Sequence, residues 1–238
     1  MDNAIYATLT RQSGLMNEMR SVANNIANAN TTGFPREGVI FSEYMVSLDR
    51  NGTTLAMANA RGRMVDLRQG GLTMTNGKLD LAIESEGFFL VETPQGNRLT
   101  RNGAFTLSAD GELVDMAGNR VLDEGQGPIA VPDGVKNIGI GPDGTISADD
   151  QPVGRIGVFA TPDPSVLLHQ SGNLLTPGPD LEPMEDVKVR QGFLEESNVE
   201  PVLELTRMIE VQRAYELGQS FLDNEDQRIR NVINSLTR

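Results

Sequence analysis

The chain has 238 residues, of which 38% are hydrophobic but only 5% are aromatic, and it contains no tryptophan. This length suits one β module with helical ends, and so few large aromatic side chains argue against a large apolar ligand cavity. The net charge of −13 disfavours nucleic acid, because binding to phosphates depends largely on Lys and Arg. The absence of cysteine excludes disulfides, thiolate nucleophiles and cysteine metal sites.

The N-terminal sequence lacks the features of a secretory signal, since it has neither a basic start nor an uninterrupted apolar run. Nowhere does an apolar run reach the roughly 18 residues that a bilayer-spanning helix requires. We therefore expect no conventional signal peptide and no membrane insertion.

The first thirty residues predict a helix. Residues recur in alternating steps of four and three, which is the spacing of a heptad seam: Ile5, Leu9, Gln12, Met16, Met19, Ala23 and Ile26. Asparagine accumulates between Asn24 and Thr32, and Gly33 followed by Pro35 is typical of a helix end. The pattern predicts a helix over about Asn3–Ala29.

The middle of the chain has the pattern of an antiparallel β module over about residues 70–192. Strands are predicted over residues 79–83, 88–91, 154–159 and 187–189. Turns are predicted at Gln95-Gly96, Asn102-Gly103, Asp110-Gly111, Ala117-Gly118, Asp133-Gly134 and Asp143-Gly144. Residues 42–66 and 161–183 are rich in small and polar residues with weak periodicity, so we expect connectors or long loops there.

A second helix is predicted near the C-terminus. Pro201 suits a first helical turn, and Ser197 or Asn198 is available as its cap. A more polar seam follows: Leu205, Ile209, Gln212, Glu216, Gln219, Leu222 or Asp223, Asp226, Ile229, Ile233 and Leu236. Gly218 lies within this helix and costs about 1 kcal/mol relative to Ala.

Charge is uneven along the chain. Residues 1–40 have no net charge and residues 195–238 carry −4, which leaves −9 on the middle segment. The predicted helices are therefore better suited to close packing than the β module.

Patterns that suggest catalysis or ligand binding have simpler interpretations. His169 is the only histidine, and we interpret it as a surface or turn residue. Residues Gly139 to Gly144 match G-x-G-x-x-G, but Pro142-Asp143-Gly144 favours a β-turn over a helix that holds a dinucleotide. Asp143 and Asp149 lack the glycine and glutamate spacing of a calcium loop. We expect no catalytic residue, no cofactor and no metal site.

Three segments carry a resemblance to a known family. Residues 23–34, ANNIANANTTGF, closely resemble the A-N-N-L-A-N-x-x-T-x-G-F signature of flagellar rod and hook proteins. Residues 192–199, GFLEESNV, and 208–216, MIEVQRAYE, are similar to the C-terminal signatures of the same family. The blocks at 99–105, LTRNGAF, and 110–114, DGELV, resemble its central module. Because the chain is compact, it is most similar to the proximal-rod members, with the distal-rod members as the close alternative.

The resemblance implies a fold class and a domain organisation. We expect a mainly β fold: a central antiparallel β module over 70–192, flanked by N- and C-terminal α-helices that pair in a coiled-coil-like terminal domain. That terminal assembly domain would comprise residues 1–35 and 198–238, with 36–69 as a connector. The two ends are expected to be mobile in the free subunit and to fold as they assemble, because isolated helices are marginal in water.

The resemblance also implies a structural subunit of the bacterial flagellar basal-body rod, in the periplasm of a Gram-negative cell. Its partners would be other rod proteins and copies of itself in a helical tube, after passage through the flagellar type III export apparatus. We expect the assembly interface to contain the two seams and the signature residues: Ile5, Leu9, Gln12, Met16, Met19, Ala23, Asn24, Asn25, Ile26, Asn28, Gly33, Phe34, Ser197, Asn198, Leu205, Ile209, Gln212, Arg213, Tyr215, Leu222, Ile229 and Ile233.

Three alternatives stay open at this point. The seam residues could form an antiparallel coiled coil within one subunit. The chain could be an extracellular β binding module on a coiled-coil stalk. It could also be a hydrolase that uses His169.

Overall fold

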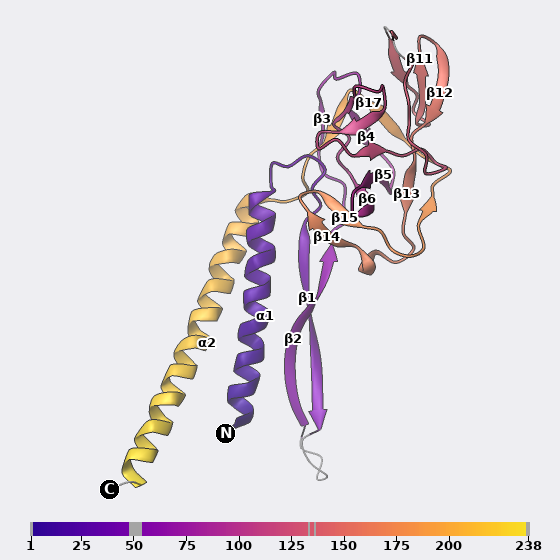
Figure 1. The fold of residues 1–238 in the computed structure, drawn as a ribbon. Coiled ribbons are helices and arrows are strands. Elements are labelled where there is room, and N and C mark those ends of the chain that lie inside the picture. The colour runs from indigo at the N-terminus through magenta and orange to yellow at the C-terminus, as the bar shows by residue number, and fades with distance from the viewer. Residues whose placement is uncertain (1, 48–53, 133, 136, 237–238) are drawn as a thin grey trace. The chain divides into compact units, whose positions relative to one another are not determined.

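The computed structural model describes residues 2–47, 54–132, 134–135 and 137–236 (Figure 1). The chain divides into two compact units. The first contains Met1–Ala27, Glu37–Met64 and Glu200–Arg238, and the second contains Asn28–Arg36 and Val65–Val199. Within the described residues, none of the helices combines the length and the apolar character needed to cross a membrane.

Two long helices dominate the first unit. Helix α1 spans Asp2–Ala27 and helix α2 spans Pro201–Leu236, and the two lie side by side with opposite directions (Figure 1). Both predicted helices are therefore confirmed. Pro201 occupies the first turn of α2, where its missing N–H would have no helical partner in any case.

The same unit contains a β-ribbon that the sequence analysis missed. Strand β1 (Glu37–Ser47) pairs with strand β2 (Thr54–Val65) in a two-stranded sheet, and β1 contacts α1. The expectation of connectors or loops over residues 42–66 is wrong for the described part, and residues 48–53 lie outside it. A ribbon held by main-chain hydrogen bonds and by contact with a helix does not require strict apolar alternation, so its periodicity is weak.

The second unit holds the remaining strands, all in antiparallel pairs. They are β3 (Leu72–Met74), β4 (Leu81–Ile83), β5 (Phe88–Thr93), β6 (Gly96–Thr100), β7 (Phe105–Leu107), β8 (Leu113–Asp115), β9 (Arg120–Val121), β10 (Ile138–Ile140), β11 (Thr145–Ala148), β12 (Gln151–Arg155), β13 (Val158–Ala160), β14 (Leu168–Ser171), β15 (Leu174–Thr176), β16 (Glu182–Pro183), β17 (Val189–Gln191) and β18 (Phe193–Glu195). A 3₁₀ turn, η1, spans Pro164–Val166.

One sheet of nine strands organises this unit. Its main path is β14-β15-β6-β5-β9-β8-β7, and β13 joins β5 to β16. Smaller sheets are formed by β10-β11-β12, by β4 with β17 and by β3 with β18. The structure thus confirms a mainly β fold with antiparallel sheets and a helix at each end.

Strand β5 lies at the centre of the core. Successive side chains of a strand point to opposite faces, so Phe89 and Val91 join one buried cluster while Phe88 and Leu90 join the other. All four side chains are buried. The apolar run Phe88 to Val91, which predicted a strand, has this character because both faces of β5 are covered.

Most turn predictions in the described residues are confirmed. Gly96, Gly111, Gly118 and Gly144 all have positive φ; Gly96 is the first residue of β6 after its turn from β5, and the other three lie between paired strands. Asn102-Gly103 is the exception, because it joins β6 to β7, which are not paired. A Cβ on Gly103 would lie 1.8 Å from the carbonyl oxygen of Leu81, so this glycine permits a close backbone approach rather than a hairpin. Asp133 lies outside the described residues.

Two further predictions have mixed outcomes. The stretch 161–183, expected as a loop, contains η1, β14, β15 and β16, and β15 joins the main sheet through the pair Leu175 and Leu99. The glycine motif at 139–144 is confirmed as a β-turn between β10 and β11, with Gly144 N donating to Gly141 O at 2.9 Å.

Candidate assembly interface

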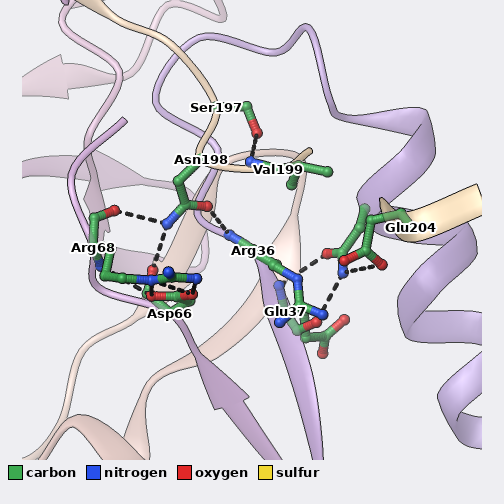
Figure 2. Close-up of polar contacts among 9 residues, drawn as sticks. Arg36, Glu37, Asp66, Arg68, Ser197, Asn198, Val199 and Glu204 are labelled. Carbon is green, nitrogen blue, oxygen red and sulfur yellow. Dashed lines mark hydrogen bonds and ion pairs between the residues drawn. The ribbon is translucent and has the colours of Figure 1, made fainter. Parts of the chain in front are cut away.

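A buried asparagine joins three segments of the first unit. The side chain of Asn25 is fully buried, and its Oδ1 accepts from Glu37 N at 2.9 Å while its Nδ2 donates to Glu37 O at 2.8 Å. Nδ2 also donates to the Glu204 carboxylate at 3.2 Å. Asn25 therefore satisfies the main chain at the start of β1 and holds the first turns of α2 against the end of α1. Figure 2 shows the Glu37 and Glu204 side chains of this group.

Glu37 and Glu204 are themselves buried. Arg63 Nη1 on β2 lies 3.3 Å from Glu37 Oε1 and forms an ion pair with it. A buried carboxylate is tolerated only when charge or hydrogen bonds compensate for lost hydration, so these partners restrict how α1, β1 and α2 can pack.

Two more polar contacts fix the pairing of α1 with α2. Arg207 Nε donates to Glu18 Oε1 at 2.6 Å, and Glu18 is buried. Nearer the N-terminus of α1, Gln12 Nε2 donates to the carbonyl oxygen of Tyr215 at 3.0 Å. Gln12 and Glu18 of α1 contact Tyr215 and Arg207 of α2, respectively. Residue numbers therefore rise along α1 as they fall along α2, as in an antiparallel pair.

Gly218 has a role that its helix propensity did not suggest. A Cβ at this position would lie 2.6 Å from Gln12 Nε2. The missing side chain makes room for the Gln12 amide against the backbone of α2. The glycine therefore offsets part of its propensity cost by allowing a close helix contact.

Most of the buried positions of the two helices lie one residue before a residue of the predicted seam. The buried positions of α1 are Gln12, Gly14, Leu15, Glu18, Ser21, Val22 and Asn25. Gln12 belongs to the predicted seam, whereas Met16, Met19 and Ile26 are half-buried and Ala23 is exposed. In α2 the buried positions are Glu204 and Val211, where the sequence analysis chose Leu205 and Gln212. One residue is about 100° of helix rotation. The contact of α1 with α2 within the subunit therefore uses a different face from most of the predicted seam, and the role of the seam in contacts between subunits stays a prediction.

The predicted interface residues accordingly differ in burial. Gln12, Asn25, Gly33 and Phe34 are buried. Ile5, Met16, Met19, Asn24, Ile26, Asn28, Ser197, Asn198, Tyr215 and Leu222 are half-buried. Leu9, Ala23, Leu205, Ile209, Gln212, Arg213, Ile229 and Ile233 are exposed. Glu18, Glu37, Glu204 and Arg207 were missed, because an isolated charge in a helical sequence looks like an ordinary solvent-facing residue.

The signature segments meet in the second unit. Gly33 has φ +64°, and its N–H donates to Glu195 O at 2.8 Å. A Cβ on Gly33 would lie 2.3 Å from Asn102 N, so only glycine fits. Phe34 is 1% exposed and stacks on His169 with ring centroids 4.8 Å apart. The N-terminal, central and C-terminal signatures therefore contact one another through Gly33, Asn102 and Glu195.

A buried ion pair reinforces this junction. Arg101 Nη1 lies 3.3 Å from Glu195 Oε2, and Glu195 Oε1 accepts from Gly70 N at 3.0 Å. Burial raises the pKa of Glu195, although Arg101 opposes the shift. Burial also lowers the pKa of Arg101, against the effect of Glu195. Burial thus opposes ionisation of both groups, and each partner offsets part of that effect for the other.

Ser197 and Asn198 do not cap α2 as predicted. Asn198 Oδ1 accepts from Arg36 N at 2.6 Å, while its Nδ2 donates to Asp66 O at 3.0 Å and to Arg68 O at 2.7 Å (Figure 2). Ser197 Oγ donates to Phe34 O at 3.0 Å. Both side chains bond within the second unit, and α2 begins only at Pro201. They tie the segments that precede β1 and α2 to one another.

His169 has a packing role. It lies on β14, stacks on Phe34, and its Nε2 donates to Pro35 O at 2.9 Å. Among the described residues, no group of three or more His, Cys, Asp or Glu side chains is arranged to hold a metal ion.

Known proteins match along the chain. Residues 6–34 match the family described as flagella basal body rod protein, residues 82–148 match the flagellar hook protein FlgE/F/G D1 domain, and residues 190–236 match the flagellar basal body rod FlgEFG protein C-terminal region. These ranges cover most of α1, strands β5 to β11 of the β module and all of α2.

Relatives that match over nearly the whole chain are rod proteins as well. The chain is 40% identical over 242 residues to the flagellar basal-body rod protein FlgF of Caulobacter vibrioides, with 99% of this chain and 98% of the relative covered. It is 36% identical over 220 residues to FlgF of Mesorhizobium japonicum, covering 91% and 90%. It is 28% identical over 261 residues to FlgG of Bacillus subtilis, covering 98% and 99%.

A helix at each end of an antiparallel β fold, with matches over nearly all of its length, defines a structural rod subunit. The chain belongs to the flagellar basal-body rod protein family. Within that family it is most like the FlgF members, which favours the proximal rod over the distal-rod alternative.

The Asn25 contacts predict a large effect for Asn25→Asp. A carboxylate at this position cannot donate to Glu37 O and would face the buried Glu204 carboxylate, so we expect a loss of about 3 kcal/mol or more. The loss would appear as a lower midpoint for thermal loss of helical circular dichroism. Asn30→Asp, at an exposed asparagine, is the matched control and should change little. Equal effects from the two substitutions would contradict the role of Asn25.

The Arg101 ion pair predicts a pH-dependent penalty for Arg101→Met. The substitution leaves Glu195 buried without its cation and raises the pKa of that carboxyl further. The folded state then binds more protons than the unfolded state above about pH 4.5, so stability falls as pH rises through the raised pKa. We expect a cost of about 3 to 5 kcal/mol at neutral pH in urea unfolding, and a smaller cost near pH 5.

Arg120→Met supplies the control for this comparison. Arg120 forms exposed pairs with Glu112 and Glu92, and solvent screens such pairs, so they contribute little to stability. A penalty for Arg101→Met that is the same at both pH values, or no larger than that of Arg120→Met, would refute the argument.

Proposed function

We propose that this rod subunit polymerises through its terminal helices, with α1 and α2 supplying the inner contacts of a helical tube. The single observation that supports this proposal is the distribution of apolar side chains on α2. Val202, Leu205, Ile209, Leu217 and Ile233 are more than half exposed, while Glu204 on the same helix is 2% exposed. A helix that buries a carboxylate and exposes its aliphatic residues has apolar surface left for other molecules.

The internal pairing of α1 with α2 is compatible with this proposal. The structure contains a helix pair within one subunit, and that pair leaves the apolar residues of α2 uncovered. The uncovered apolar surface of the helix pair therefore lies mainly on α2. Leu205, Ile209, Ile229 and Ile233 are our principal candidates for contacts between subunits.

The proposed partners are copies of this chain and other rod proteins. Growth of a helical assembly uses head-to-tail contacts, in which two different surfaces of each subunit match. We also propose passage through the flagellar type III export apparatus and folding of the terminal segments as they assemble. Marginal stability of long, polar helices outside an assembly supports that order of events.

Truncation after Glu200 tests this function. The shortened chain keeps the whole second unit, including buried Val199, but lacks α2. We expect its β circular dichroism signal to persist, while swimming in soft agar and its recovery in isolated basal bodies are lost. A full-length variant with Asn224→Ala, at an exposed polar residue of α2 outside the predicted seam, should swim normally. Normal swimming by the truncated chain would rule out the terminal-helix mechanism.

A further inference from the structure

The chain passes between its two units four times, and one side chain forms hydrogen bonds beside three of these crossings. The crossings lie between residues 27 and 28, 36 and 37, 64 and 65, and 199 and 200. The side-chain amide of Asn198 accepts from Arg36 N at 2.6 Å. It also donates to the carbonyl oxygens of Asp66 and Arg68 at 3.0 and 2.7 Å (Figure 2). We call these three hydrogen bonds the Asn198 clamp.

The second unit holds the same segments by further bonds. Asp66 N donates to Arg36 O at 2.8 Å, and Ser197 Oγ donates to Phe34 O at 3.0 Å. Both hydrophobic clusters of the molecule lie within residues 65–189, so the core of this unit contains no residue of α1 or α2. The clamp therefore belongs to a unit whose core does not depend on the helices.

In the first unit, the deepest burial occurs next to the crossings. Asn25, Glu204 and Glu37 are 0, 2 and 4% exposed, and they form one hydrogen-bonded group. Burial then decreases along α2: Val211 is its last buried residue, and residues 226–236 are all exposed. Segments with little buried surface open at low free-energy cost, so the packing of the helix pair is weakest far from the crossings.

The clamp lowers the entropic cost of starting this packing. Asn25 must meet both Glu37 and Glu204, which are far apart in the sequence, and closing a long loop reduces conformational entropy. Helix formation also has an unfavourable first step. Arg36 is followed directly by Glu37, and Asn198 precedes Glu204 by six residues. A clamp that joins Arg36 to Asn198 thus brings the starts of β1 and α2 together before the helices pack.

We propose that Asn198 is a positioning residue for the folding of the first unit. The clamp in the folded second unit directs α1, β1 and α2 to pack first around Asn25, and packing then proceeds along the helices toward the two chain termini. The proposal rests on the proposed function, in which the terminal segments fold as they assemble, and adds the order in which they fold and the residue that sets it.

Hydrogen exchange of the free full-length subunit, measured by mass spectrometry and corrected for intrinsic rates, tests the order of folding. We expect the amides of residues 205–212 to exchange at least about tenfold more slowly than those of residues 229–236, because buried segments open less often. Residues 201–204 are left out, since the first amides of a helix have no helical acceptor. Equal protection along α2, or none at residues 205–212, would overturn the proposal. Neither result alters the outcome of the truncation test of assembly.

Asn198→Ala tests the clamp itself. Loss of its three hydrogen bonds should speed exchange at residues 205–212 about tenfold and leave the amides of β5 unchanged. Asn119→Ala is the matched control. Asn119 is also a half-buried asparagine of the second unit, and its Nδ2 donates to Asp115 Oδ2 at 2.7 Å, within the turn between β8 and β9. This control should leave exchange at residues 205–212 unchanged.

A purely local role for Asn198 gives a different result. Faster exchange confined to the segments around Arg36, Asp66 and Arg68, with α2 unchanged, would contradict the proposal, as would equal effects from the two substitutions. If Asn198→Ala also speeds exchange in β5, the comparison is repeated with Ser197→Ala, which removes the bond to Phe34 O. Residues 205–212 should again respond while β5 does not, and no response there would overturn the proposal.

Discussion

The packing of the first unit depends on the burial of a charged side chain of α2, Glu204. Glu204 is buried and bonded to Asn25, and Asn25 also satisfies the main chain of Glu37. A buried carboxylate that loses its partner is costly, so this side of α2 must face α1 and β1. Helical geometry then directs Leu205 and Ile209 away from α1 and leaves them exposed. Burial of a polar group within the subunit thus creates the apolar surface that assembly can use.

The second unit applies a related constraint to the segments that adjoin the helices. Gly33 allows the chain after α1 to approach Asn102 closely, and Glu195 binds both Gly33 N and Arg101. Both the oxygen and the nitrogen of the Asn198 side-chain amide form hydrogen bonds with main-chain atoms, those of Arg36, Asp66 and Arg68. Residues 33–36 and 195–198 are therefore held by hydrogen bonds within the second unit. This convergence gives a physical reason for the signatures at 23–34, 99–105 and 192–199.

Sequence reasoning located elements whose signals are local. The sequence predicted both helices, the glycine turns between paired strands and the buried strand β5. Each has a signal among neighbouring residues: helical periodicity, a glycine that permits positive φ, or a continuous apolar run. The burial of Glu18 and Glu204 was not predicted, because these side chains are buried only through partners distant in the sequence. The β1-β2 ribbon, the close contact at Gly218 and the bonds of Ser197 and Asn198 depend on tertiary contacts in the same way. The function was predicted from the resemblance to the family. The residues that fix the packing of the helices and of the signature segments could be identified only in the structure.

Hydroxyl-radical footprinting of α2 in the free subunit and in isolated basal bodies tests the central claim most directly. Oxidation of Leu205, Ile209, Ile229 and Ile233 should be strong in the free subunit and fall at least about tenfold in the rod, because neighbouring subunits exclude water from these side chains. Exposed Met116 on the β module provides the internal reference for each sample. Equal oxidation of the four α2 residues in both samples would contradict the account.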